Sequence, residues 1–180
     1  GDNWMMIGRL DQVAAPGTYL TANVAGEPLL VVRDEKGMLR GFFNVCRHRG
    51  TRLVDAPRGE GLERLRCPYH AWTYALDGTL THAPRMAANF AKAGFSLVQA
   101  RLGFFWGFIF VNLDDRAEPL ERYLADLPDL TRYRMGELRC GKRVEYEVEA
   151  NWKLIWQFKE RSSLSRNESQ KSRSEQGPRR

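Results

Sequence analysis

Four residues with metal-binding side chains occur in two short boxes near the middle of the sequence. Cys46 and His48 form a C-x-H box, and Cys67 and His70 form a C-x-x-H box, with eighteen residues between the boxes. Two of the three cysteines and two of the three histidines of the chain lie there. Thiolates and imidazoles are ligands of zinc and of iron–sulfur clusters. The sequence therefore predicts a metal centre built from these four side chains.

The spacing indicates that both boxes lie in tight loops, because ligands one or two residues apart otherwise point in different directions. Gly50 and Pro68 supply loop-forming residues at the boxes, and Gly59 and Gly61 do so between them. Two metal centres fit the donor set. One is a tetrahedral zinc ion, and the other is a [2Fe-2S] cluster in which cysteines hold one iron and histidines hold the other.

The residues around the boxes resemble one family. The stretches NVCRHRGTRLV (44–54) and CPYHAWTYALDGTL (67–80) are similar to Rieske [2Fe-2S] proteins. They most resemble the Rieske domain in the large (alpha) subunit of aromatic-ring-hydroxylating non-haem iron oxygenases, and the resemblance covers residues 1 to about 157. Respiratory-chain Rieske proteins carry two further cysteines beside the cluster. Thr51 and Tyr69 stand at those positions here, so the respiratory branch is disfavoured.

Two differences from the family pattern are visible, and neither affects a ligand. The insert of eighteen residues is slightly longer than is usual, and Ala71 stands where glycine usually follows the last histidine. By this resemblance Cys46 and Cys67 hold the iron that stays ferric, while His48 and His70 hold the iron that is reduced. The resemblance implies no catalytic residue in this chain.

The resemblance also implies a larger parent oxygenase. Electrons would pass from NAD(P)H through a flavin reductase or ferredoxin to the Rieske cluster, and then to a mononuclear Fe(II) that adds oxygen to an aromatic substrate. Such subunits commonly form homotrimers or hetero-hexamers. The mononuclear iron needs two histidines and a carboxylate. Because only His82 lies outside the boxes, we expect the chain alone to be catalytically incompetent and His82 to be an ordinary loop residue.

Two other functions stay open. One is a free-standing Rieske-type ferredoxin, an electron carrier without a substrate, and the other is a zinc-stabilised structural domain, which predicts a colourless protein. The segment Asn151-Trp152-Lys153 resembles the start of the oxygenase catalytic domain and favours the oxygenase. Arg47 and Arg49 flank His48 and could attract an acidic ferredoxin.

The strand pattern predicts a mainly β fold, and the resemblance implies a Rieske-type antiparallel β-sandwich with two cluster-binding loops. Apolar, β-prone runs predict strands at 19–24, 29–32, 39–45, 72–75 and 79–81, with a tight turn at Asp77-Gly78. The run 102–113 predicts one long buried strand or a strand pair. A short helix is predicted over 120–127. A strand at 144–148 and a helix from Trp152 would begin a truncated α+β catalytic domain.

These elements suggest three regions. We predict a Rieske domain at 1–115, a connector and the start of the catalytic domain at 116–157, and a disordered tail unlike the family at 158–180. Residues 161–180 contain one leucine and no aromatic residue, and cannot form a core. Trp72 and Tyr74 are predicted core residues, with Tyr69 and Trp72 shielding the cluster, and Pro84 is assigned to a loop that covers it.

Charge and cysteine usage argue against some partners. The net charge is +6, of which residues 161–180 contribute +4, so the basic character belongs mostly to the tail and nucleic acid is not a predicted partner. The sequence has no run of about twenty apolar residues, so no membrane span is predicted. Cys140 is the one cysteine outside the boxes. The absence of a disulfide framework suits a reducing cytoplasm.

Overall fold

Short runs of β-branched and aromatic residues form antiparallel sheets, as expected for the predicted mainly β fold. The computed structural model describes residues 3–87, 89–139, 141–142, 144 and 149–151. The chain divides into two compact units, residues 1–141 and 142–180. All the sheets and helices described below lie in the first unit. None of the helices in these described residues is long and apolar enough to cross a membrane.

The central sheet has the strand order β4-β3-β2-β5, and all its neighbouring strands are antiparallel. Its strands are β2 (Tyr19–Val24), β3 (Glu27–Arg33), β4 (Leu39–Phe43) and β5 (Arg58–Gly59). Ala25 and Gly26 connect β2 to β3 with φ angles of 52° and 89°, which suits a two-residue hairpin. The strands predicted at 19–24, 29–32 and 39–45 are confirmed, although β3 begins earlier, at Glu27, and β4 ends earlier, at Phe43.

A second sheet has the order β1-β10-β9. Its strands are β1 (Met5–Arg9), β9 (Arg101–Phe105) and β10 (Phe108–Asn112). The apolar run at 102–113 is therefore a strand pair, and its turn at Trp106 and Gly107 again has two positive φ angles, 49° and 80°. A 3₁₀ turn (Leu10–Val13) follows β1.

A third, smaller sheet supports the second donor box. It consists of β6 (Leu65–Arg66), β7 (Thr73–Tyr74) and β8 (Leu80–His82) in that order, and a 3₁₀ turn (Lys92–Phe95) follows it. The predicted turn at Asp77-Gly78 is confirmed. Gly78 has a φ of 89°, and a Cβ there would lie 2.6 Å from the Phe42 ring, so the hairpin packs closely on β4. Position 78 therefore requires glycine, both for its positive φ angle and for the lack of space for a Cβ.

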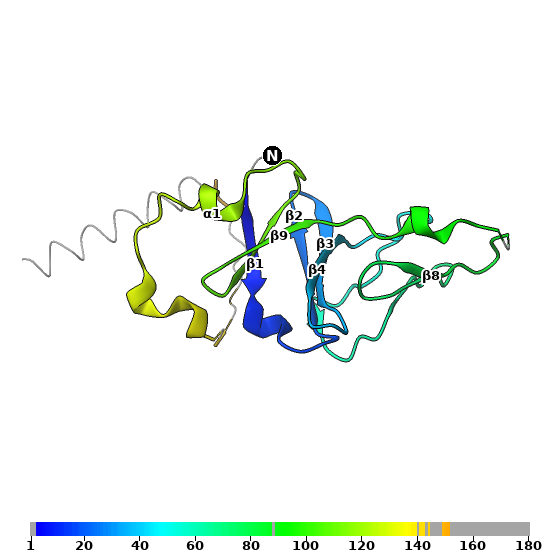
Figure 1. Cartoon of the computed structure of the whole chain (residues 1–180), viewed down its shortest axis with the longest axis horizontal. Coiled ribbons are helices and arrows are strands. Elements are labelled where there is room, and N and C mark those ends of the chain that lie inside the picture. Colours follow the sequence, from blue (N-terminus) through cyan, green and yellow to red (C-terminus); the bar gives the residue numbers. More distant parts are fainter. Residues whose placement is uncertain (1–2, 88, 140, 143, 145–148, 152–180) are drawn as a thin grey trace, which may run out of the picture. The chain divides into compact units, whose positions relative to one another are not determined.

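The central sheet lies between the second sheet and the donor loops, as Figure 1 shows for β2, β3 and β4 between β1 and β9 on one side and β8 on the other. Successive side chains of a strand point to opposite faces. Leu29 and Val31 of β3 pack toward the second sheet, and Leu30 and Val32 pack toward the donor loops. Both faces of β3 are therefore buried, which explains its unbroken apolar sequence.

The segment after β10 is only partly helical. Helix α1 (Leu120–Tyr123) is a single turn, so the prediction of a helix through residue 127 was too long. Two 3₁₀ turns (Thr131–Tyr133 and Met135–Glu137) follow it. Arg9 donates to the carbonyls of Met135 and Leu138, which holds this segment against β1. Residues 145–148 of the strand predicted at 144–148 and the helix predicted from Trp152 lie outside the described residues, and the three predicted regions remain a prediction.

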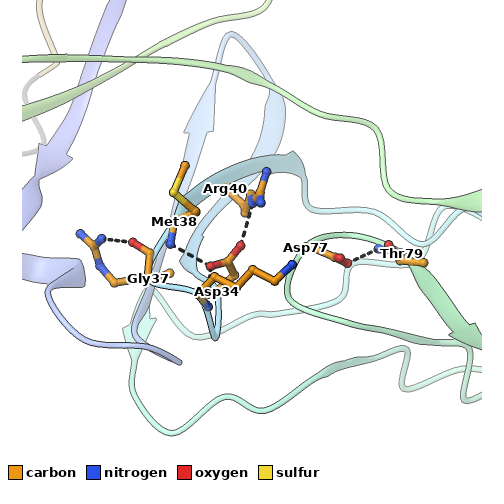
Figure 2. A network of polar contacts seen from close by, with 8 residues as sticks. Asp34, Gly37, Met38, Arg40, Asp77 and Thr79 are labelled. Carbon is orange, nitrogen blue, oxygen red and sulfur yellow. Dashed lines mark hydrogen bonds and ion pairs between the residues drawn. The ribbon is translucent and has the colours of Figure 1, made fainter.

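Asp34 organises the turn between β3 and β4. Its side chain is buried, and its Oδ1 accepts hydrogen bonds from the N–H groups of Lys36 (3.0 Å) and Met38 (2.8 Å). Its Oδ2 accepts from Arg40 Nε at 2.9 Å (Figure 2). Asp34 and Asp77 line one small cavity of about 70 Å³, so this turn lies beside the β7–β8 hairpin. Burial raises the pKa of Asp34, but the hydrogen bonds outweigh it and lower the pKa overall.

We expect Asp34→Asn to reduce the free energy of unfolding by about 1–2 kcal/mol at pH 7, because the charge-assisted bond to Arg40 is lost. Since folding lowers the pKa of Asp34, its carboxylate contributes stability above its ordinary pKa of 3.8. That contribution is lost as the pH falls through the folded value. Urea titrations from pH 7 to pH 3 should show the difference between the two proteins shrinking below pH 3.8. The exposed substitution Asp55→Asn is the control, and an equal loss in both variants would contradict the account.

Candidate metal centre

Each donor box lies in a loop that is closed by a backbone hydrogen bond, and the two bonds are equivalent. The Gly50 N–H donates to the Cys46 carbonyl (2.9 Å), and the Ala71 N–H donates to the Cys67 carbonyl (3.1 Å). The fifth residue of each loop has a left-handed backbone, with φ of 70° at Gly50 and 58° at Ala71. The predicted tight loops are thus present, and each brings one cysteine and one histidine together within a single turn.

The left-handed backbone explains why Ala71 is a notable departure from the family pattern. A residue with a Cβ is less stable than glycine in this conformation by roughly 1 kcal/mol, and part of that difference is offset in the unfolded chain. We expect Ala71→Gly to raise the free energy of unfolding by about 0.5–1 kcal/mol.

Gly50→Ala is the matched converse and should lower the free energy of unfolding by a similar amount. A Cβ at Gly50 meets no atom within 4 Å, so this variant tests backbone strain alone. Urea unfolding of both variants measures the effect. A stabilised Gly50→Ala or a destabilised Ala71→Gly would show that the left-handed φ is not the cause.

The four donors form two pairs. Cys46 and Cys67 are buried free thiols that lie close enough for one to raise the pKa of the other. The rings of His48 and His70 lie 4.7 Å apart at an angle of 67°. The Nδ1 atoms of both histidines are buried and have no hydrogen-bond partner among the described residues. Each imidazole therefore has a buried nitrogen to which the described residues offer no hydrogen bond.

The pKa values of the donors are shifted by their surroundings. Burial raises the pKa of the Cys46 thiol, and the hydrogen bond with Tyr74 opposes this effect. Burial lowers the pKa of His70, and the charges of His48, Arg49 and Arg85 lower it further. A histidine with a lowered pKa stays neutral at physiological pH. Its nitrogen lone pair then remains available to a metal.

Tyr74 connects the two loops through its hydroxyl. This residue lies on β7, is fully buried, and places its hydroxyl 3.3 Å from Cys46 Sγ. The backbone N–H of Arg47 donates to the same hydroxyl at 3.1 Å. Because the oxygen accepts that bond, its own proton is free to point at the sulfur. Burial and the contact with Cys46 both raise the pKa of Tyr74, which keeps the hydroxyl protonated.

Aromatic rings cover the histidine pair from two sides. Trp72 is buried and stacks on His48, with ring centroids 4.8 Å apart and planes 8° apart. Phe90 and Phe95 also pack against this indole group, each with its ring centroid 5.6 Å from that of Trp72. Tyr69 stacks on His70 at 3.7 Å but is 59% exposed. The core role predicted for Trp72 and Tyr74 is confirmed. Tyr69, which was predicted to shield the cluster, contacts His70 at the surface of the protein.

A cavity of about 690 Å³ borders the two histidines. Exposed arginine side chains and exposed apolar side chains both contribute to its lining. It is lined by His48, Arg66, Cys67, Pro68, Tyr69, His70, Ala71, Pro84, Arg85 and Met86. Pro84 therefore lies beside the donor loops, where its loop was expected. A partner at this surface could approach the histidine pair closely.

The donor arrangement can be compared with the two metal centres left open above. Within residues 3–87 and the other described segments, no three Cys, His, Asp or Glu side chains are placed to hold one metal ion. A tetrahedral zinc site needs four donors around one ion. A mixed-ligand [2Fe-2S] cluster instead takes a cysteine pair on one iron and a histidine pair on the other. The thiol pair and the unbound Nδ1 pair fit the cluster better.

Residues 3–100, more than half of the chain, match the family described as the Rieske [2Fe-2S] domain. The chain belongs to the Rieske [2Fe-2S] domain family. Membership implies a [2Fe-2S] cluster as the cofactor, in agreement with the donor set. The antiparallel, mainly β architecture expected for a Rieske domain is likewise confirmed.

Oxygenase subunits are among the proteins similar to this Rieske chain. The glycine betaine monooxygenase oxygenase subunit of Chromohalobacter salexigens is 37% identical over 154 residues, which are 84% of this chain and 34% of that protein. The chlorobenzene dioxygenase subunit alpha of Cupriavidus sp. is 32% identical, over 86% of this chain and 36% of that subunit. The chain thus spans little more than a third of these relatives' lengths.

Solved structures give the same result for the Rieske fold. A quaternary ammonium Rieske monooxygenase in complex with its substrate L-carnitine has a TM-score of 0.75 and 33% identity, over 85% of this chain and 45% of that one. Naphthalene 1,2-dioxygenase with indole bound has a TM-score of 0.63 and 35% identity, over 68% of this chain and 28% of that one. Both monooxygenases and dioxygenases therefore share this domain.

The structure adds residues that the sequence did not single out. Arg85 was not predicted to act on His70, and Tyr74 was predicted only as a core residue. The one local signal for Tyr74 was its position four residues after His70, on a strand that leaves the second box. His82, expected in a loop, instead lies exposed on β8, paired with Thr73. It takes no part in the donor pairs.

Proposed function

We propose that Cys46 and Cys67 bind one iron of the [2Fe-2S] cluster and that His48 and His70 bind the other, so that the chain acts as an electron-input domain of an oxygenase alpha subunit. The observation that carries the proposal is the pairing of two buried thiols with two inward, unbound Nδ1 atoms. A bound cluster of this kind accepts and passes on single electrons. The histidine edges border the surface cavity, which gives electrons a short path to a partner.

Two measurements on the purified chain test this proposal. The protein should be red-brown and contain about two iron atoms and about two acid-labile sulfides per chain. Its reduction potential should lie between roughly −150 and +300 mV, above the value of about −400 mV typical of all-cysteine plant-type ferredoxins. A colourless protein with stoichiometric zinc and no sulfide would reject the proposal in favour of a structural zinc domain.

We infer that the electron donor is a ferredoxin or flavin reductase with an acidic docking surface. Arginines surround the histidine pair, and no ion pair is found for them within the described part of the chain. They are Arg47, Arg49, Arg66 and Arg85, and all four are exposed. Complementary charge chiefly accelerates association between such partners.

The double substitution Arg49→Glu and Arg85→Glu should slow reduction by an acidic plant-type ferredoxin about 10-fold at low salt. The electrostatic attraction that accelerates association of the two proteins becomes repulsion in this variant. The difference should shrink at high ionic strength as the charges are screened. Stopped-flow reduction of the cluster measures the rate. The control Arg58→Glu, on β5, makes one such charge reversal elsewhere and should have little effect, whereas Arg49→Glu or Arg85→Glu alone should each slow reduction. Equal slowing in both proteins would argue against a docking role.

An oxygenase is favoured over a free-standing electron carrier by the extent of the similarity. The family match ends at residue 100, whereas the oxygenase subunits remain similar over 154 to 162 residues. A carrier has no need for sequence shared with an oxygenase beyond its cluster domain. We propose that the parent protein carries a mononuclear iron and assembles from several subunits, as homotrimers or hetero-hexamers. Sedimentation analysis of the complete subunit would test the assembly.

The substrate of the parent protein is proposed from two groups of relatives. The sequence resemblance suggested an aromatic substrate, which chlorobenzene dioxygenase represents at 32% identity. The glycine betaine and carnitine monooxygenase oxygenase subunits are 33–37% identical. We therefore propose a quaternary ammonium compound as the preferred substrate. Product formation by the complete enzyme with L-carnitine, glycine betaine and chlorobenzene would decide, and turnover of chlorobenzene alone would reject this choice.

A further inference from the structure

Three of the buried polar atoms that lack a hydrogen-bond partner among the described residues belong to the rings around the donor site. Two are the Nδ1 atoms of His48 and His70, which the proposed function uses as iron ligands. The third is Nε1 of Trp72, a residue that is only 1% exposed. An indole N–H is always a hydrogen-bond donor and never a ligand of this cluster. The iron-binding roles proposed for the two histidines therefore do not explain why the Trp72 N–H lacks a partner.

The rings packed against Trp72 offer no acceptor to this N–H. His48 stacks on the indole at 4.8 Å with nearly parallel planes, and Phe90 and Phe95 contact it at 5.6 Å. The sulfurs of Cys46 and Cys67 are present in the structure, and neither accepts the bond. A buried donor without an acceptor is unfavourable. The missing acceptor is therefore an atom that the described residues do not supply.

We propose that Trp72 donates its indole N–H to an inorganic sulfide of the bound cluster and is a positioning residue of the electron-transfer site. The inference rests on the proposed function, since the sulfide is present only when the cluster is bound. Stacking fixes the indole beside His48, so one side chain both orients an iron ligand and supplies a donor. A hydrogen bond to sulfur stabilises the reduced, more negative cluster and raises its reduction potential.

The test uses the whole chain labelled with ¹⁵N in the indole group of tryptophan. Pulsed EPR of the reduced protein should show a ¹⁵N coupling that is lost in Trp72→Phe, a variant that keeps an aromatic ring but has no donor. The reduction potential of Trp72→Phe should fall. Trp106→Phe is the matched control, because Trp106 lies in the β9–β10 turn, and it should leave both the coupling and the potential unchanged.

A second variant keeps the inference testable if Trp72→Phe does not fold. β-(3-Benzothienyl)alanine at position 72 has the shape of the indole group without its N–H, and it should lose the coupling and lower the potential. A red-brown labelled protein with no ¹⁵N coupling, or with potentials unaffected by loss of the donor, would overturn the inference alone and indicate a buried water as acceptor. A colourless protein without acid-labile sulfide would overturn the proposed function and this inference together.

Discussion

Replacing Cys67 with serine is expected to abolish stable cluster binding. Changes to residues that only support a metal ligand typically weaken binding by 10–100-fold, so loss of a thiolate ligand should weaken it by more than about 100-fold. The purified variant should contain little iron or acid-labile sulfide and lack the visible absorption of the cluster. Because the cluster joins the two donor loops, the variant should also unfold at a lower urea concentration than the wild-type protein.

The chain offers a matched control for this substitution. Cys140 lies outside both boxes, and Cys140→Ser should keep the full iron and sulfide content. Iron and sulfide analysis of the two variants, purified in parallel without air, gives the comparison. Full cluster content in Cys67→Ser would mean that Cys67 is not a ligand, and loss of the cluster from Cys140→Ser would point to a different donor set.

Tyr74→Phe should lower the reduction potential of the cluster by about 40–60 mV. The hydroxyl lies 3.3 Å from Cys46 Sγ and is free to donate to it. A hydrogen bond of this kind is worth about 1 kcal/mol, and 1.4 kcal/mol corresponds to about 59 mV for one electron. The sulfur carries more negative charge in the reduced state, so losing the donor disfavours reduction. Redox titration monitored by EPR measures the shift.

The ring of Tyr74 is fully buried and remains in the phenylalanine variant, so the cluster should still bind. Tyr69→Phe removes a hydroxyl from the ring that stacks on His70 and is the matched control. Its potential should stay at the wild-type value, because in the described part of the chain no hydrogen bond joins the Tyr69 hydroxyl to Cys46 or Cys67 sulfur. A Tyr74→Phe potential equal to that of the wild-type protein would show that the contact with Cys46 does not act on the cluster.

Local patterns in the sequence predicted much of the fold and all four candidate donors. The strand at 19–24 agrees with β2, because its β-prone residues are bounded by turn residues on both sides. The hairpin at Asp77-Gly78 follows from a dipeptide that suits a two-residue turn. The donor boxes depend on spacings of one and two residues, so the loops that contain them could be predicted without knowledge of distant contacts.

The features that the sequence did not predict depend on long-range contacts. Strand β1 pairs with β10, so that Met6 lies opposite Phe110. The two strands are far apart in the sequence and are not joined by a turn that would predict this pairing. Helix α1 is short because Leu120 is the one buried apolar residue of the helix predicted at 120–127, while Leu127 is 48% exposed. A short helix without packing is unstable. Contacts of the same long-range kind bring Arg85 to the electrostatic surroundings of His70.

The most direct test of the account is to count the histidine nitrogens bound to the cluster. Pulsed EPR of the reduced chain labelled with ¹⁵N-histidine should show two ¹⁵N couplings, from His48 and His70. His82→Ala should retain both couplings, because this residue lies outside the donor pairs. A reduced cluster with no histidine coupling, or with only one, would contradict the proposal that the two donor boxes each supply one cysteine and one histidine to a [2Fe-2S] cluster.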